Sequence, residues 1–135
     1  MVRFLFGIFI VLHGLVHLWY VALSQRLIEF QPEMGWTGES WIFTPLLGDA
    51  VTRALASVLC ALATIGFTTG GIGMLIRQEW WRSMVVGSAA LSTAIVVLFW
   101  DGSLELIVEK GLIAFLINVA ILVALLVLKW PPGAF

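Results

Sequence analysis

The sequence predicts an all-α fold, an antiparallel bundle of four transmembrane helices with an outer interfacial loop cap. Hydrophobic residues make up 61% of the 135 residues and charged residues only 11%, too few polar groups to cover a soluble domain. Four stretches lack Asp, Glu, Lys and Arg, and each approaches the roughly 20 residues that a helix needs to cross about 30 Å of hydrocarbon. These stretches also lack the alternation of barrel strands, the other structure that satisfies its backbone in lipid.

The predicted helices cover residues 4–25, 54–76, 83–100 and 111–128. With the long outer loop 26–53, they make the chain 1–135 a single membrane domain. The turn between the second and third helices, RQEWWR, is short, so these helices are antiparallel neighbours. The apolar composition makes the lipid bilayer the expected partner, and the net charge of −1 argues against nucleic acid.

The first predicted helix contains the only two histidines of the chain, His13 and His17. They lie four residues apart, and Tyr20 and Ser24 continue the same helical face toward the outer end. Because imidazoles are poorly accommodated by lipid, this polar face is expected to point toward neighbouring helices or a wet cavity.

Two interpretations of the histidines stay open. In the structural one, both imidazoles are neutral and hydrogen-bond to polar residues of other helices, with Asn118, Thr64 and Ser92 as candidates. In the functional one, they bind a ligand, a metal or a proton, because ionisable residues inside the membrane mark functional sites more often than surface residues do.

The functional interpretation predicts an intramembrane ligand pocket lined by His13, His17, Tyr20 and Asn118. His13 and His17 would also be the ligands of a divalent metal, but a zinc site needs at least three protein ligands and no motif ties a third residue to the pair. Two ligands on one face of one helix cannot reach opposite faces of a porphyrin, so haem would require one histidine alone or pairing across a dimer.

Small residues recur in the second and third helices. Gly66, Gly70, Gly71 and Gly73 lie in the second helix, and Gly87 lies in the third. Small residues allow helix backbones to approach closely in a membrane. The pattern therefore favours helix packing over a substrate path.

The loop 26–53 is too long for a simple link and combines Pro and Gly with many large apolar residues. It is expected to fold back onto the bundle or to lie in the interface. An acidic outer mouth above the histidines would use Glu39, Trp41 and Asp101, together with Glu33; the alternative is that these acids are solvated loop charges. The connection 101–110 is expected to form a short interfacial helix.

Charge at the helix ends predicts the topology. The side that holds both termini carries four basic residues against three on the other side, which favours cytoplasmic termini. The basic residues of the first side are Arg3, Arg77, Arg82 and Lys129, and those of the second are Arg26, Arg53 and Lys110. We therefore expect a multi-pass protein of the cell membrane with both termini in the cytoplasm.

The opening stretch RFLFGIFIVLHGLVHL, followed by three more short spans, resembles the small four-helix DoxX-like membrane proteins. Arg3, Gly7 and Gly14 occupy the kinds of position at which that family has a basic residue and two glycines. The resemblance implies a link with membrane oxidoreductase assemblies and quinones, without identifying catalytic residues. Small multidrug transporters also have four short spans, but they carry an acidic residue in the first span where this chain has histidines.

These observations favour a small integral membrane protein that acts as a ligand-binding or accessory subunit, in a membrane complex or as a homodimer. One alternative is a redox subunit that binds quinone, haem or a divalent metal. The other is a small proton-coupled transporter, for which the unperturbed titration range of histidine would be suited.

Overall fold

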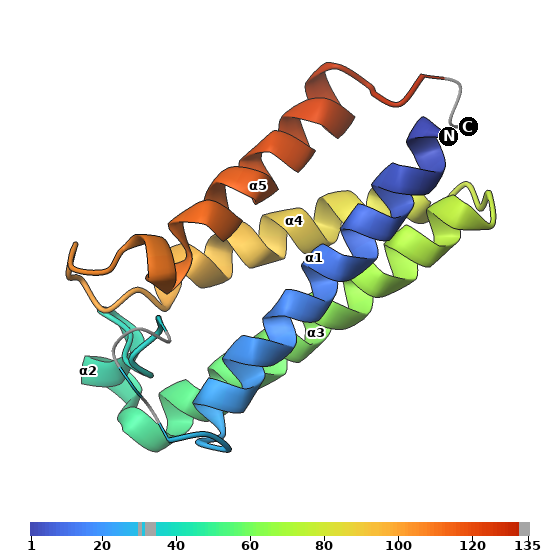
Figure 1. The fold of residues 1–135 in the computed structure, drawn as a ribbon. Helices are drawn as coiled ribbons and strands as arrows, with labels where there is room; N and C mark the ends of the chain where they lie inside the picture. The colour runs from blue at the N-terminus through green and yellow to red at the C-terminus, as the bar shows by residue number, and fades with distance from the viewer. Residues whose placement is uncertain (30, 32–34, 133–135) are drawn as a thin grey trace.

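The computed structural model describes residues 1–29, 31 and 35–132, and this part of the chain is helical and contains no strand. Four long apolar helices pack against one another and run back and forth between two ends of the molecule (Figure 1). Met1 and the last described residues lie at one end, which we call the terminal end. The short helix α2 and the loops beside it form the opposite, cap end, so the predicted fold class is confirmed.

The elements follow in the order α1 (Val2–Ser24), α2 (Phe43–Leu47), α3 (Asp49–Leu75), α4 (Trp81–Leu98), the π-helical turn η2 (Val108–Leu112), α5 (Ile113–Leu122) and the π-helical turn η3 (Val123–Val127). The last three are continuous and form the fourth span. The predicted helices agree with these bounds to within a few residues, except that α3 begins at Asp49 rather than at residue 54. Asp49 lies in the first turn of α3, where its carboxylate interacts favourably with the helix dipole and pairs with Arg53 at 3.0 Å.

Glycines bring α1 and α3 into close contact. A Cβ on Gly71 would lie 2.9 Å from the carbonyl oxygen of Gly7, and a Cβ on Gly14 would lie 2.6 Å from the Cβ of Phe67. On another face of α3, a Cβ on Gly66 would collide with the side chain of Ser88 on α4. The prediction that small residues serve helix packing is confirmed at these positions, because any larger side chain would force the helices apart.

Two apolar clusters fill the bundle. The cluster toward the terminal end contains Ile10, Phe67, Met74, Trp81, Val85, Ala89, Ile121 and Leu125. The cluster toward the cap end contains Leu23, Trp36, Ala56, Cys60, Ala63, Ile95 and Phe99. Since both clusters draw residues from several spans, they hold the helices together along their length.

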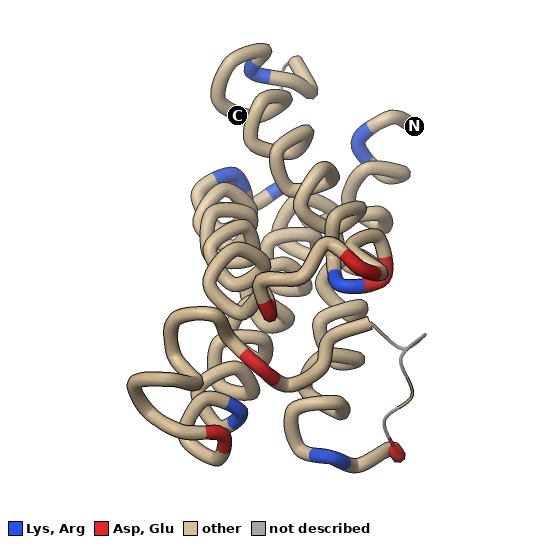
Figure 2. Tube along the Cα trace, turned by 90° about the vertical axis from the view of Figure 1, so that its left-hand side faces the viewer, with Lys and Arg blue, Asp and Glu red and all other residues tan. Residues whose placement is uncertain are grey.

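Charged residues lie near the helix ends and in the connections, and long stretches of helix carry none (Figure 2). Three arginines donate hydrogen bonds to carbonyl oxygens in the last turn of a neighbouring span, groups that the helix itself leaves without a partner. These bonds join Arg3 to Met74 at 3.1 Å, Arg53 to Ser24 at 3.0 Å and Arg82 to Leu125 at 3.0 Å. The arginines thus link spans as well as setting the charge at each end.

The outer loop folds back onto the bundle over its described residues 35–48, as predicted. The indole of Trp36 is buried and meets the ring of Phe99 edge-on at 6.2 Å. Ser40 donates to the carbonyl of Leu98, and the indole N–H of Trp41 donates to the carbonyl of Val97 at 2.8 Å. The cap therefore satisfies the C-terminal carbonyls of α4 in the way that the arginines satisfy those of the other spans.

The short interfacial helix expected within residues 101–110 does not form as a separate element in the described chain. Asp101 instead accepts the backbone N–H of Ser103 at 2.9 Å in a turn, and the chain then passes directly into η2. Gly111, with φ 116°, gives η2 its non-helical bend, a conformation that strongly favours glycine. The fourth span thus begins with a kink against the end of α4.

Candidate functional site

Four buried polar side chains from three spans form one hydrogen-bonded group inside the bundle, which we call the polar cluster: His13, His17, Ser92 and Asn118. His13 Nε2 lies 2.8 Å from Asn118 Oδ1, and Asn118 Nδ2 donates to Ser92 Oγ at 2.7 Å. Ser92 Oγ also lies 2.6 Å from His17 Nε2. The cluster therefore ties α1 to both α4 and α5.

The partners define a consistent direction for every hydrogen bond. His17 Nδ1 lies 3.1 Å from the carbonyl oxygen of His13, and a carbonyl can only accept, so Nδ1 carries a hydrogen. His17 Nε2 then accepts from the Ser92 hydroxyl, Ser92 Oγ accepts from the Asn118 amide, and Asn118 Oδ1 accepts from His13 Nε2–H. This arrangement needs no proton beyond those of neutral imidazoles.

These bonds confirm the predicted pairing of the histidines with Asn118 and Ser92 on neighbouring helices. The third candidate partner, Thr64, donates instead to the carbonyl of Cys60 on its own helix at 3.0 Å. Thr64 lies on α3, and the α3 side chain that contacts both histidines is an aromatic ring rather than a polar group.

That aromatic ring belongs to Phe67. Its centroid lies 4.9 Å from that of His13 and 5.5 Å from that of His17. Phe9 stacks on His13, with the ring centroids 6.0 Å apart. Gly14, between the histidines in sequence, leaves the space that allows Phe67 to reach both rings. Aromatic and helical neighbours thus shelter the imidazoles from lipid, as expected from the polar face of α1.

A cavity of about 30 Å³, the His17 cavity, lies beside the polar cluster toward the cap end. It is lined by His17, Tyr20 and Ser92, and by Lys110 from η2. This volume accommodates about two water molecules. The predicted site residue Tyr20 therefore shares a cavity with His17, while Asn118 and His13 do not line it.

Lys110 forms a buried ion pair with Asp101. The distance between Nζ and Oδ2 is 2.8 Å, and only 8% and 9% of the two side chains are exposed. Two neighbouring opposite charges form a neutral pair whose partners depend on each other, because either one alone would be a costly buried charge. Lys110 is not among the predicted site residues, because its only signal in the sequence is a basic residue directly before a charge-free span.

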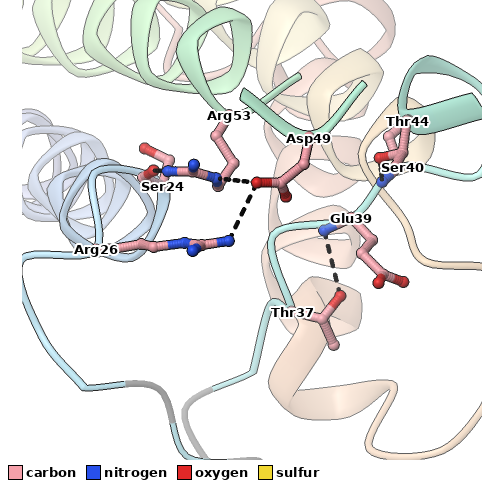
Figure 3. Close-up of polar contacts among 8 residues, drawn as sticks. All are labelled: Ser24, Arg26, Thr37, Glu39, Ser40, Thr44, Asp49 and Arg53. Carbon is pink, nitrogen blue, oxygen red and sulfur yellow. Dashed lines mark hydrogen bonds and ion pairs between the residues drawn. The ribbon is translucent and has the colours of Figure 1, made fainter. Parts of the chain in front are cut away.

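The outer mouth predicted from Glu39, Trp41 and Asp101 is brought together only in part. Asp101 does not line the His17 cavity itself, but it forms an ion pair with Lys110, which does. Glu39 is exposed and points away from the Asp49 ion pairs (Figure 3), and Trp41 is half-exposed with its indole bound to the end of α4. Glu33 lies outside the described residues.

A separate polar group at the cap end has a structural role (Figure 3). Asp49 pairs with Arg26 at 3.1 Å and with Arg53 at 3.0 Å, and Arg53 binds the last carbonyl of α1. Ser24, the outermost member of the predicted polar face, hydrogen-bonds to Ser57 on α3. These contacts join the ends of α1 and α3 and do not extend the polar cluster.

Two larger hollows meet at Lys110. The first, the α4–α5 groove, has a volume of about 270 Å³ and is lined by Val96, Val97, Trp100, Ile107, Lys110, Leu112 and Phe115. The second, the cap vestibule, has a volume of about 300 Å³ and is lined by Gly35, Thr37, Asp101, Ser103, Glu105, Leu106 and Lys110. The walls of the groove are apolar apart from Lys110, whereas the vestibule is partly polar.

The residues of the site do not fit a haem or a three-ligand metal centre. No group of three His, Cys, Asp or Glu side chains gathers within the described residues. Both ring nitrogens of His17 already have hydrogen-bond partners. The His17 cavity is also far smaller than a porphyrin.

No protein-family model matches this chain, and neither does any curated protein or solved structure. The class of the protein is therefore defined by its fold. Helices of 23, 27, 18 and 20 residues are each long and apolar enough to cross a membrane, and they pack into one bundle. The chain is a small multi-pass membrane protein.

Proposed function

We propose that this protein is a ligand-binding or accessory subunit of the membrane, whose ligand places a polar group in the His17 cavity. The single observation that carries the proposal is the Tyr20 hydroxyl. Tyr20 lines the cavity together with His17 and Lys110, yet its hydroxyl has no hydrogen-bond partner in the described part of the chain. A hydroxyl in this position can donate to a bound molecule without breaking a contact of the fold.

The location of the cavity supports a binding role. Polar and ionisable groups inside a membrane bundle are costly, and they normally mark sites or pathways. Each side chain of the polar cluster has a hydrogen-bond partner inside the bundle, and neither His13 nor Asn118 lines the cavity, so these two residues position His17 rather than contact the ligand directly. Toward the terminal end, His13 is followed by the apolar cluster around Phe67, which argues against access from the terminal end.

A quinone-binding redox subunit is the second candidate, and the resemblance of the opening helix to DoxX-like proteins favours it. We rank it below a general binding role because Gly7 and Gly14 are already explained by the contact of α1 with α3. Proton-coupled transport ranks third, because the apolar cluster lies between the polar cluster and the terminal end.

The basic excess at the terminal end supports a topology in which both termini are cytoplasmic. In that topology the His17 cavity lies in the outer half of the membrane. A partner complex or a homodimer would be the setting of an accessory role.

The proposal is tested by native mass spectrometry of the protein extracted in mild detergent, with Tyr20→Phe compared with the wild type. The substitution removes only the hydroxyl, so the fold is expected to persist while retention of the copurifying small molecule falls. Leu18→Phe, on the exposed face of α1, is the matched control and is expected to retain it. Equal retention by Tyr20→Phe, or a wild-type protein that carries only bulk lipid, would refute the binding role.

A further inference from the structure

The His17 cavity and the α4–α5 groove are neighbours that share two lining residues, Val96 and Lys110. The groove has apolar walls formed by residues such as Val97, which is 46% exposed, and Phe115. It lies between two spans, so its open side faces the hydrocarbon. A molecule that occupies both hollows would have an apolar part in the groove and a polar part in the cavity.

The charges around the cavity favour an uncharged polar part. Lys110 is already paired with Asp101 at 2.8 Å, so the pair is neutral as a whole. The hydrogen bonds of the polar cluster need no proton beyond those of neutral imidazoles, so the cluster presents no net charge. A charged head would therefore be buried beside a compensated pair, with no partner of its own, which is strongly unfavourable.

The available donors define the head further. The Tyr20 hydroxyl is unpartnered in the described chain, and an ammonium group has hydrogens beyond the one that Lys110 gives to Asp101. His17 Nε2, in contrast, is already bonded to Ser92. The Lys110 ammonium can only donate, and the Tyr20 hydroxyl can donate as well as accept, so the two groups together favour an acceptor such as a carbonyl oxygen.

We propose that the ligand is a membrane-dissolved amphipathic molecule that enters from the bilayer between α4 and α5. Its apolar chain lies in the α4–α5 groove, and its uncharged, hydrogen-bond-accepting head lies in the His17 cavity. This assignment rests on the proposed binding function and adds the class of ligand and its route. The Lys110–Asp101 pair acts as the selector that excludes charged heads.

Labelling with photoreactive amphiphiles tests the assignment in reconstituted vesicles. Three probes carry the same alkyl chain and the same diazirine and differ only in the head: a methyl ketone, a sulfonate and a trimethylammonium. The two charged heads keep their charge at any pH used. The wild type is expected to crosslink the ketone probe at groove residues at least about tenfold more than either charged probe.

A groove variant and a matched control establish where the probe binds. Val97→Trp fills the groove and is expected to abolish the crosslink, whereas Leu116→Trp, on the lipid-facing side of α5, is expected to leave it unchanged. Equal crosslinking of all three probes, insensitive to Val97→Trp, would mean adventitious partition along the lipid-facing surface and would overturn the assignment.

Charge variants test the selector. Asp101→Asn leaves Lys110 unpaired, and the preference is expected to shift at least about tenfold toward the sulfonate. Lys110→Met leaves Asp101 unpaired and is expected to shift it toward the trimethylammonium probe. The double variant Lys110→Met/Asp101→Asn carries neither charge, and its preference is expected to return to the ketone probe. This variant keeps the test decisive even if one of the single variants fails to fold.

The outcomes separate the assignment from the proposed function. If the protein retains a native molecule that depends on Tyr20 but prefers a charged probe, or if the charge variants change nothing, the ligand class is wrong and the binding role stands. If a native molecule depends on Tyr20 but no probe crosslinks in the groove, the ligand class is also wrong, because a water-soluble ligand entering through the cap vestibule would give that outcome. If Tyr20→Phe has no effect on any bound molecule, the binding role itself fails.

Discussion

Asn118 Oδ1 lies 2.8 Å from His13 Nε2, and this hydrogen bond joins the fourth span to the first. The backbone of α5 packs on α4 rather than on α1, so α1 and α5 meet through side chains. Asn118 also donates to Ser92 on α4. One amide thus connects three helices at the middle of the bundle.

Asn118→Leu is expected to destabilise the protein. Leucine is close to asparagine in size, but it leaves the N–H of His13 and the hydroxyl of Ser92 without their buried partner, which should lower the free energy of unfolding by about 2 kcal/mol. Unfolding in mixed micelles with increasing dodecyl sulfate measures this quantity. Leu116→Ile, a substitution on the lipid-facing side of α5, serves as the control and should be neutral. An Asn118→Leu protein of wild-type stability would show that the hydrogen bond contributes nothing.

Gly71→Ala is expected to force α1 and α3 apart. The added Cβ would lie 2.9 Å from the carbonyl oxygen of Gly7 and 3.1 Å from the backbone nitrogen of Val11, atoms that cannot move without the helix. The free energy of unfolding should fall by about 1–3 kcal/mol. Gly87→Ala is the matched control, because a Cβ there meets nothing within 4 Å, and it should be neutral or stabilising by about 0.5–1 kcal/mol. Equal effects of the two substitutions would argue against close packing at Gly71.

Gly35→Ala is expected to loosen the cap. Gly35 has φ 106°, and a Cβ on it would collide with the carbonyl oxygen of Glu109, so alanine would push the loop away from η2. Amide hydrogen exchange over residues 35–48 should accelerate by about tenfold. Gly38→Ala isolates the backbone strain, since Gly38 also has a positive φ, 90°, but only ordinary contact with Arg53 at 3.6 Å. Comparable acceleration in both variants would mean that the contact with Glu109 does not hold the cap.

Single cysteines at the two ends of the bundle test the topology. In a Cys60→Ala background, Glu29→Cys is expected to react with a membrane-impermeant maleimide added outside sealed cells, and Gln78→Cys is expected to react only after permeabilisation. The basic residues at the terminal end give the physical reason, since they favour the cytoplasmic side. Cys60 itself is buried, so its replacement should not expose a new surface. The reverse labelling pattern would place both termini outside.

The sequence predicted the spans well because their information is local. A stretch without charge must be covered by hydrocarbon or by other helices, and its length limits where the helix ends. The shared face of His13 and His17 followed from helical geometry alone, as did the expectation that glycines serve packing. The start of α3 at Asp49 was missed because a charged first turn looks like loop in a composition window, although the dipole and Arg53 stabilise it there.

The predicted outer mouth depended on contacts that the sequence does not encode locally. The prediction that Asp101, Glu39 and Trp41 lie together rests only on their expected position on the same side of the membrane. In the structure Asp101 pairs with Lys110 in a buried position, while Glu39 faces outward. Two charges that flank a turn, such as Asp101 and Lys110, give no periodic signal that they meet.

Local sequence patterns are enough to show that this protein is a membrane bundle, where its helices run and which face of the first helix is polar. The partners of that face depend on how the helices pack. His13 and Asn118 are 105 residues apart, and they meet only because glycine contacts set the rotation and distance of α1 and because the kink at Gly111 directs the fourth span. Periodicity places a side chain on its own helix, but only packing between helices determines which side chain it meets.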